Sequence, residues 1–110
     1  MKQAKRKRLE TAGWKVGDAQ EFLGLTDDEL AMIEVKLRLA KALRLERTKR
    51  KLTQYELSQK LGSSQSRIAK MESGDPSVSL DLLIRSLFKL GATRLDIARH
   101  LAFPKKRRAA

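Results

Sequence analysis

The chain has 110 residues and carries 25 Lys and Arg residues against 13 Asp and Glu residues, for a formal net charge of +12. This length allows one small domain with one core, and the excess of positive charge favours a polyanionic partner, most simply a nucleic acid. The sequence contains no cysteine and no apolar run long enough to span a bilayer, which excludes disulfides, iron–sulfur sites, thiolate zinc sites and a transmembrane helix.

The first 25 residues predict a basic arm followed by an irregular extension. Residues 1–8 hold five Lys or Arg residues with no apolar stretch after them, so we expect no signal peptide and a cytoplasmic protein. Such an arm either lies along nucleic-acid phosphates or is a solvated tail. Three glycines interrupt the rest of this segment, and we expect one helical turn at residues 18–23, with Trp14 and Phe22 packing on the domain.

A long helix is predicted from residue 27 to about residue 51. Thr26 and Glu29 have the spacing of a capping box, in which each side chain accepts a hydrogen bond from the other residue's backbone N–H. Asp27 and Asp28 complement the positive end of the helix dipole. Glycine and proline are both absent from the range, so no residue is expected to end the helix earlier.

The N-terminal half of this helix carries more apolar residues than one buried face needs. They form two rows, Leu30, Ile33 and Leu37 in one and Met32, Val35 and Leu39 in the other. One row can pack on the rest of the domain, with Leu39 and Leu43 entering its core. The other row needs either the segment around Trp14 and Phe22 or a second chain, and the sequence leaves both open. The residues predicted for such an oligomer or partner interface are Met32, Ile33, Val35 and Leu37.

Two short helical patterns follow, joined by a glycine. In the first, Thr53 predicts an N-cap, and Leu57 and Leu61 lie four residues apart on one apolar face. Gly62 can take the positive φ that ends such a helix.

The second pattern begins at Ser63 or Ser64 and has Ile68 and Met71 as its buried side. The run of Gly74, Asp75 and Pro76 ends it. Two helices joined by a short turn that contains glycine form a helix-turn-helix.

Two further helices are predicted towards the C-terminus. Ser79 caps residues 80–90, whose buried stripe is Leu83, Leu87 and Leu90, and Gly91 ends this helix. Thr93 caps a last helix over residues 94–101, which is expected to bury Leu95, Ala98 and Leu101. His100 has no second ligand type or nucleophile near it in the sequence, so we expect a surface residue rather than a catalyst or a metal ligand.

The stretch from residue 52 to residue 74 resembles the Xre family, also called Cro/C1-like, the phage-repressor type of helix-turn-helix. The matching residues are those of the TQ-x-x-L opening, the turn glycine, the SQS-x-I start of the second helix and the closing E-x-G: Thr53, Gln54, Leu57, Gly62, Ser64, Gln65, Ser66, Ile68, Glu72 and Gly74. The resemblance covers roughly residues 39–101. It departs at Ser58, where the family usually has alanine, and at Ser63, where an apolar turn residue is usual.

This resemblance implies an all-α, lambda-repressor-like domain, which we place at residues 26–103 with an extended first helix. Residues 1–25 form the N-terminal extension and residues 104–110 a basic tail. The second helix of the motif is expected to enter the major groove of DNA. The base-facing positions implied by the family are Ser64, Gln65, Ser66 and Lys70. The residues expected at phosphates are Gln54, Arg67, Arg50, Lys51 and Ser73. Arg47 and Glu72 match a family ion pair with a structural role.

The resemblance therefore implies a sequence-specific regulator that binds duplex DNA without a cofactor or a metal ion. We expect a homodimer on a two-fold site, because a single recognition helix makes too few contacts for useful discrimination. The alternative is an antitoxin that binds a small toxin through residues 9–38 and represses its own operon, and the sequence does not separate the two. An enzyme is poorly supported, because no histidine pair and no glycine-rich phosphate loop is present.

Overall fold

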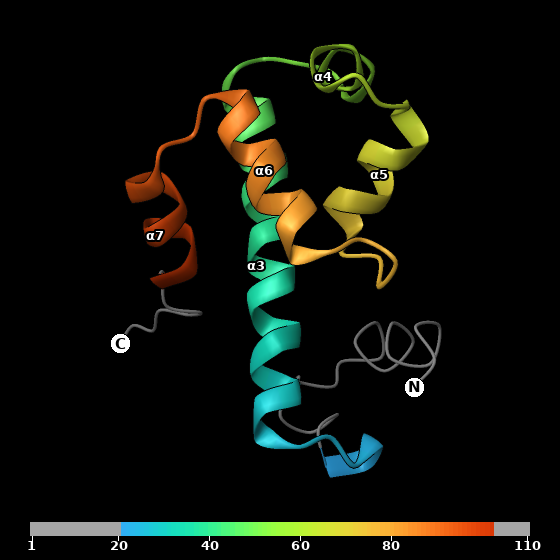
Figure 1. Ribbon diagram of the computed structural model, residues 1–110, viewed down its shortest axis with the longest axis vertical. Coiled ribbons are helices and arrows are strands. Elements are labelled where there is room, and N and C mark those ends of the chain that lie inside the picture. Colours follow the sequence, from blue (N-terminus) through green and yellow to red (C-terminus); the bar gives the residue numbers. More distant parts are fainter. Residues whose placement is uncertain (1–20, 103–110) are drawn as a thin grey trace. The chain divides into compact units, whose positions relative to one another are not determined.

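The computed structural model of the protein describes residues 21–102 and divides the chain into two compact units, residues 1–35 and residues 36–110. Helices occupy most of this range and no strand occurs in it, so the described part of the chain is all-α (Figure 1). The helices are α3 (Asp27–Lys49), α4 (Gln54–Leu61), α5 (Gln65–Ser73), α6 (Leu80–Leu90) and α7 (Arg94–Ala102). The predictions for the basic arm, Trp14 and the basic tail concern residues outside those described.

Within the first unit, residues 21–35 contain a short helical segment at 21–23 and the N-terminal half of α3. The predicted capping box at the start of α3 is present. The Glu29 backbone N–H donates to Thr26 Oγ1 over 3.2 Å, and Thr26 N–H donates to Glu29 Oε1 over 2.9 Å. Local sequence signals thus fix the point at which the long helix begins.

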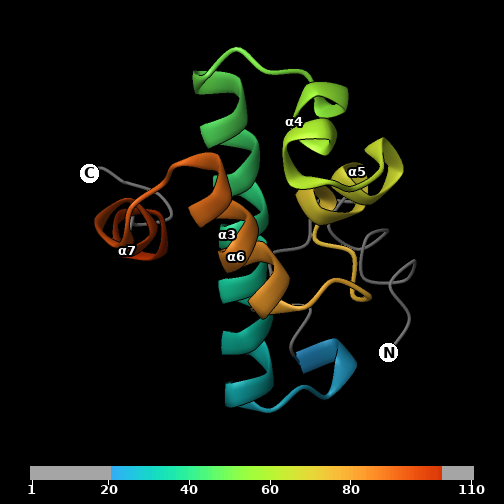
Figure 2. The same cartoon turned by 45° about the horizontal axis from the view of Figure 1, so that its top comes forward.

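The second unit has its core between the C-terminal part of α3 and helices α4 to α7. Within residues 36–102, α6 crosses α3, and α5 and α7 lie on opposite sides of this pair in both views (Figure 1, Figure 2). The large apolar side chains that are fully buried in this core are Leu39, Leu43, Leu57, Ile68, Met71, Leu83 and Leu87. Burying each of these side chains stabilises the fold by roughly 1.5–3 kcal/mol, and all of them were predicted to be buried.

Helix α3 ends without a glycine. Lys51 takes a positive φ of 59°, and the Leu52 backbone N–H donates to the Arg47 carbonyl over 3.1 Å. This turn directs the chain into α4 and places the end of the helix close to the predicted position. The predicted cap of α6 is also present, since Ser79 accepts a hydrogen bond from Leu82 N–H.

The buried face of α7 differs from the prediction. Ile97 lies in the core with 8% of its surface exposed, whereas Leu95 is 58% exposed and Ala98 is also exposed. The rows Leu95–Ala98 and Ile97–His100 both fit helical spacing, and only the first was predicted to be buried. The His100 ring contacts the Glu46 carboxylate on α3, so the row of Ile97 and His100 can face inward.

Candidate nucleic-acid interface

Helix α4 is fixed at both ends by local signals. Thr53 Oγ1 accepts a hydrogen bond from Glu56 N–H over 3.0 Å, and Glu56 Oε1 accepts one from Thr53 N–H over 2.8 Å. Gly62 ends the helix with φ 67°, as predicted. Thr53 was predicted as the cap, and the T-x-x-E spacing to Glu56 marks the capping box that was not predicted.

Helix α5 begins at the second of the two predicted caps. Ser64 Oγ accepts a hydrogen bond from Arg67 N–H over 3.1 Å, and Gly74 ends the helix with φ 74°. Ile68 and Met71 are buried, so the opposite side of α5 faces solvent. The exposed polar residues of this helix and its cap are Ser64, Gln65, Ser66, Arg67, Lys70 and Ser73.

Serine at position 58, where the family usually has alanine, fits the contact between α4 and α5. The Ser58 side chain is buried, and its hydroxyl donates to the Tyr55 carbonyl over 2.6 Å. Ser63 N–H donates to the Ser58 carbonyl over 2.8 Å and closes the turn. Because the buried Ser58 hydroxyl is hydrogen-bonded within its own helix, serine in place of the usual alanine lowers the stability of the fold little.

A charged cluster connects α3, α4 and α5 below this surface. Arg47 Nε donates to Glu72 Oε2 over 2.6 Å and Nη2 donates to Glu72 Oε1 over 3.0 Å, with the two side chains 13% and 5% exposed. The hydrogen bonds to Glu72 raise the pKa of Arg47 above its usual value. Arg47 Nη1 also donates to the Leu52 carbonyl over 2.8 Å. One guanidinium therefore ties α3 to the end of α5 and to the loop before α4.

Gln54, the first residue of α4, joins this cluster. Its Nε2 donates to Glu72 Oε1 over 3.1 Å. The structure therefore brings a residue expected at a phosphate together with the two residues expected to form a structural ion pair. Sequence spacing gave no sign of this third contact.

The family model described as helix-turn-helix, HTH_3, matches residues 41–85, from the C-terminal part of α3 through α4 and α5 into α6. These residues form an Xre-type helix-turn-helix domain. Xre-type domains bind duplex DNA in transcription regulators, and the second helix of the motif, here α5, is the recognition helix. No curated protein and no solved structure matched the chain.

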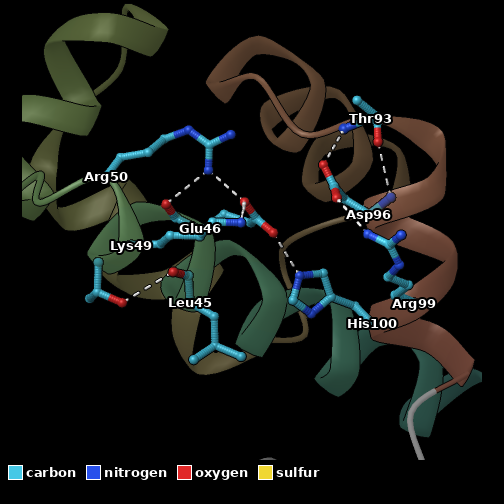
Figure 3. Close-up of polar contacts among 9 residues, drawn as sticks. Leu45, Glu46, Lys49, Arg50, Thr93, Asp96, Arg99 and His100 are labelled. Atoms are coloured by element: carbon cyan, nitrogen blue, oxygen red, sulfur yellow. Dashed lines mark hydrogen bonds and ion pairs between the residues drawn. The ribbon is translucent and has the colours of Figure 1, made fainter.

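Arg50, one of the residues expected at phosphates, forms an ion pair with Glu46 directly after the end of α3. Its guanidinium donates to the Glu46 carbonyl and to the Glu46 carboxylate, and it lies 3.2 Å from the position that a methyl group on Gly91 would take. Figure 3 shows Glu46 on α3 and Arg50, which directly follows this helix, together with His100 on α7. In Figures 1 and 2, α7 lies across α3 and α6 from the recognition helix. The structure thus shows the Arg50 guanidinium at the Glu46 carboxylate, which it shares with His100 of α7.

Glu46 is the centre of this second cluster, which no sequence motif indicates. Its side chain is 5% exposed, and Oε2 lies 2.9 Å from His100 Nε2. Because an ionised carboxylate only accepts, the His100 ring donates in this contact. Burial alone would raise the pKa of Glu46, but hydrogen bonds from His100 and Arg50 and the charge of Lys49 hold it below its usual value. His100, expected on the surface, is in fact a partly buried anchor of α7.

Residues 21–102 contain no group of three or more His, Cys, Asp or Glu side chains that could hold a metal ion. In the same range, no helix is both long and apolar enough to cross a membrane.

Proposed function

We propose that this protein is a sequence-specific transcription regulator of Xre type that acts as a homodimer on a two-fold DNA site. The observation that carries the proposal is the exposed polar face of α5. The buried Ile68 and Met71 orient the helix so that Gln65 and Lys70 face solvent. A recognition helix with this arrangement offers hydrogen-bonding groups to the major groove.

The base contacts follow from the chemistry of these side chains. Gln65 carries a donor and an acceptor that match adenine, and Lys70 matches the O6 and N7 acceptors of guanine. Ser64 uses one lone pair of its oxygen as the cap of α5, so its hydroxyl can still donate to an acceptor on DNA. Ser66 Oγ lies 3.3 Å from Ser64 Oγ, and the two hydroxyls would contact DNA side by side.

Phosphate contacts come from the ends of the two helices. Gln54 stands at the N-terminus of α4, where the helix dipole favours an anion. The exposed side chains of Arg67, Lys51 and Ser73 extend this set. Arg50 is left out of the proposed phosphate contacts, because its guanidinium is held at Glu46.

The second copy of the chain is proposed to bind the N-terminal half of α3. Met32 is 54% exposed, and Ile33 and Val35 are half-buried. Leu37 contributes less, because its Cδ2 lies 2.8 Å from the position that a methyl group on Gly74 would take, so part of this side chain packs on the domain. A row of apolar side chains left in water loses roughly 1.5–3 kcal/mol of burial for each residue.

The same row supports a second candidate, an antitoxin that binds a small toxin. The row lies N-terminal to residue 41, where the match to the helix-turn-helix family begins, so the matched residues do not include it. A pull-down from the native cell at moderate salt separates the two candidates. A small basic protein that travels with the chain would favour the antitoxin, and recovery of the chain with DNA alone would favour the homodimeric regulator.

The DNA-binding function is tested by titrating duplex DNA at several salt concentrations. Neutralised phosphates release counterions, so the logarithm of affinity should fall with the logarithm of salt concentration, with a slope near −0.9 for each contact. Several contacts lower the affinity by a factor of about 10³ or more between about 50 and 200 mM salt. Affinity that hardly changes over this range would contradict the proposal.

A further inference from the structure

We infer that Glu72 is a positioning residue for DNA binding, which sets the Gln54 amide in the orientation that a phosphate requires before DNA arrives. This inference rests on the proposed function, since it concerns a phosphate contact of the helix-turn-helix. It gives the Arg47–Glu72 pair a role beyond joining α3 to α5.

The geometry of the carboxylate decides the orientation. Glu72 Oε1 accepts from both Arg47 Nη2 and Gln54 Nε2, at 3.0 and 3.1 Å. An ionised carboxylate cannot donate, so only the NH₂ end of the Gln54 amide can face it. The Gln54 carbonyl oxygen and the second N–H of its amide are then free to point elsewhere.

A phosphate has the same requirement as the carboxylate, because its oxygens only accept. The second N–H of Gln54 is therefore the side-chain group that can bind a phosphate at the start of α4. An amide turned by 180° would place its carbonyl oxygen towards Glu72, and two acceptors would face each other. Glu72 thereby selects one of two amide orientations that would otherwise be similar in energy.

Arg47 allows an acidic residue to occupy this place. A carboxylate beneath a phosphate contact would repel DNA, but the paired guanidinium neutralises it at 2.6 and 3.0 Å. The same guanidinium holds the Leu52 carbonyl and so fixes the loop that leads to Gln54. The side chain and the backbone of the phosphate contact are thus set by one cluster.

The first test needs no DNA. In the NMR spectrum of the free protein, the Gln54 side-chain amide should show one proton shifted downfield and slow exchange with water. Gln59 and Gln65 provide internal controls, because both are exposed and neither makes a side-chain hydrogen bond within residues 21–102. Glu72→Gln should return the Gln54 signals to the range of the controls. If the Gln54 amide of the wild type exchanges as fast as those of Gln59 and Gln65, the inference is wrong.

The second test is a double-mutant cycle on duplex DNA. Gln54→Ala should weaken binding to any duplex about twofold to tenfold in the wild type, the value of one hydrogen bond, and by less than about twofold in the Glu72→Gln background. Asp81→Asn serves as a control that removes one negative charge from the exposed surface of α6. Circular dichroism checks the fold of each variant, and if Glu72→Gln unfolds, the wild-type amide spectrum still decides.

Different results would contradict the role of Glu72 and the proposed DNA-binding function. Independent effects of the two substitutions, each reducing affinity by its own factor in both backgrounds, would overturn the role of Glu72. A wild-type protein that binds no duplex DNA would overturn the proposed function instead.

Discussion

Replacing Glu46 by alanine should destabilise the domain by several kcal/mol, although this residue lies on the side away from the recognition helix. Its carboxylate is 5% exposed and contacts the ring of His100, the guanidinium of Arg50 and, at 3.9 Å, the ammonium of Lys49. Removing the carboxylate leaves His100, Arg50 and Lys49 without the acceptor that they share. Asp96 Oδ2 is engaged by its own capping contact with Thr93 and does not replace it.

The magnitude follows from the burial of each group. Removing one partner of a fully buried ion pair costs roughly 3–5 kcal/mol. Arg50 is 29% and His100 21% exposed, so both are partly hydrated after the change, and about 2–4 kcal/mol is expected here. This is a large share of the roughly 5–15 kcal/mol that stabilises a typical domain.

Urea unfolding measures this cost, with Asp81→Ala as the matched control. Asp81 and its partner Arg85 are 75% and 65% exposed, so the loss of this ion pair should cost less than about 1 kcal/mol. His100→Ala should also increase hydrogen exchange in α7. Without the His100–Glu46 contact, the burial of Ile97 has to hold this helix on the domain. A cost for Glu46→Ala no larger than that for Asp81→Ala would refute the reasoning.

Acid titration gives the same site a second signature. The pKa of Glu46 is lower in the folded protein than its ordinary value of 4.5. The stabilisation from this carboxylate is therefore fully present above about pH 4.5 and is lost as pH falls through the folded pKa. Glu46→Gln should flatten the loss of stability in this acidic window. Asp75 and Asp96, whose pKa values are also lowered, by hydrogen bonds from Ser77 and Thr93, keep part of the slope in both proteins.

Three further predictions concern the turn glycines, the recognition helix and the interface. Gly62→Ala should lower the free energy of unfolding in urea by about 1–2 kcal/mol, because alanine is strained at this positive φ. Gly74→Ala should lower it further, because a methyl group at position 74 also meets a leucine side chain of α3. Gln65→Ala should lose roughly 1–3 kcal/mol of discrimination at particular base pairs in binding-site selection, whereas Arg67→Ala should weaken all sequences alike. Met32→Glu should convert a dimer into a folded monomer in sedimentation, and unfolding would instead assign this residue to the core.

Helix ends were predictable because their signals are local. Thr53, Ser64 and Ser79 each accept a hydrogen bond from a backbone N–H three residues later, as the sequence led us to expect. Gly62 and Gly74 both take a positive φ at the end of a helix. The recognition helix could therefore be placed with its buried and exposed sides before its structure was known.

The support on the far side of the domain could not be found in this way. Glu46 and His100 are 54 residues apart in the chain, and neither belongs to a motif. The choice between the two possible faces of α7 depended on this contact, since Ile97 can face inward only when the neighbouring polar ring has a partner. The misplaced face of α7 therefore follows from this one long-range contact.

Glu46 and Arg47 show why charged residues inside a helix are hard to interpret from sequence. They are neighbours in α3, but one helical step turns their side chains by about 100°, so they serve opposite sides of the domain. Arg47 reaches Glu72 below the recognition helix, and Glu46 reaches His100 on α7. By periodicity alone, both would belong to a solvated face. The resemblance to the Xre family identified Arg47, because its partner Glu72 belongs to the motif. The partner of Glu46 is His100, which lies outside the motif in α7. The contact between Glu46 and His100 itself sets which face of α7 turns inward, so neither could be predicted without the other.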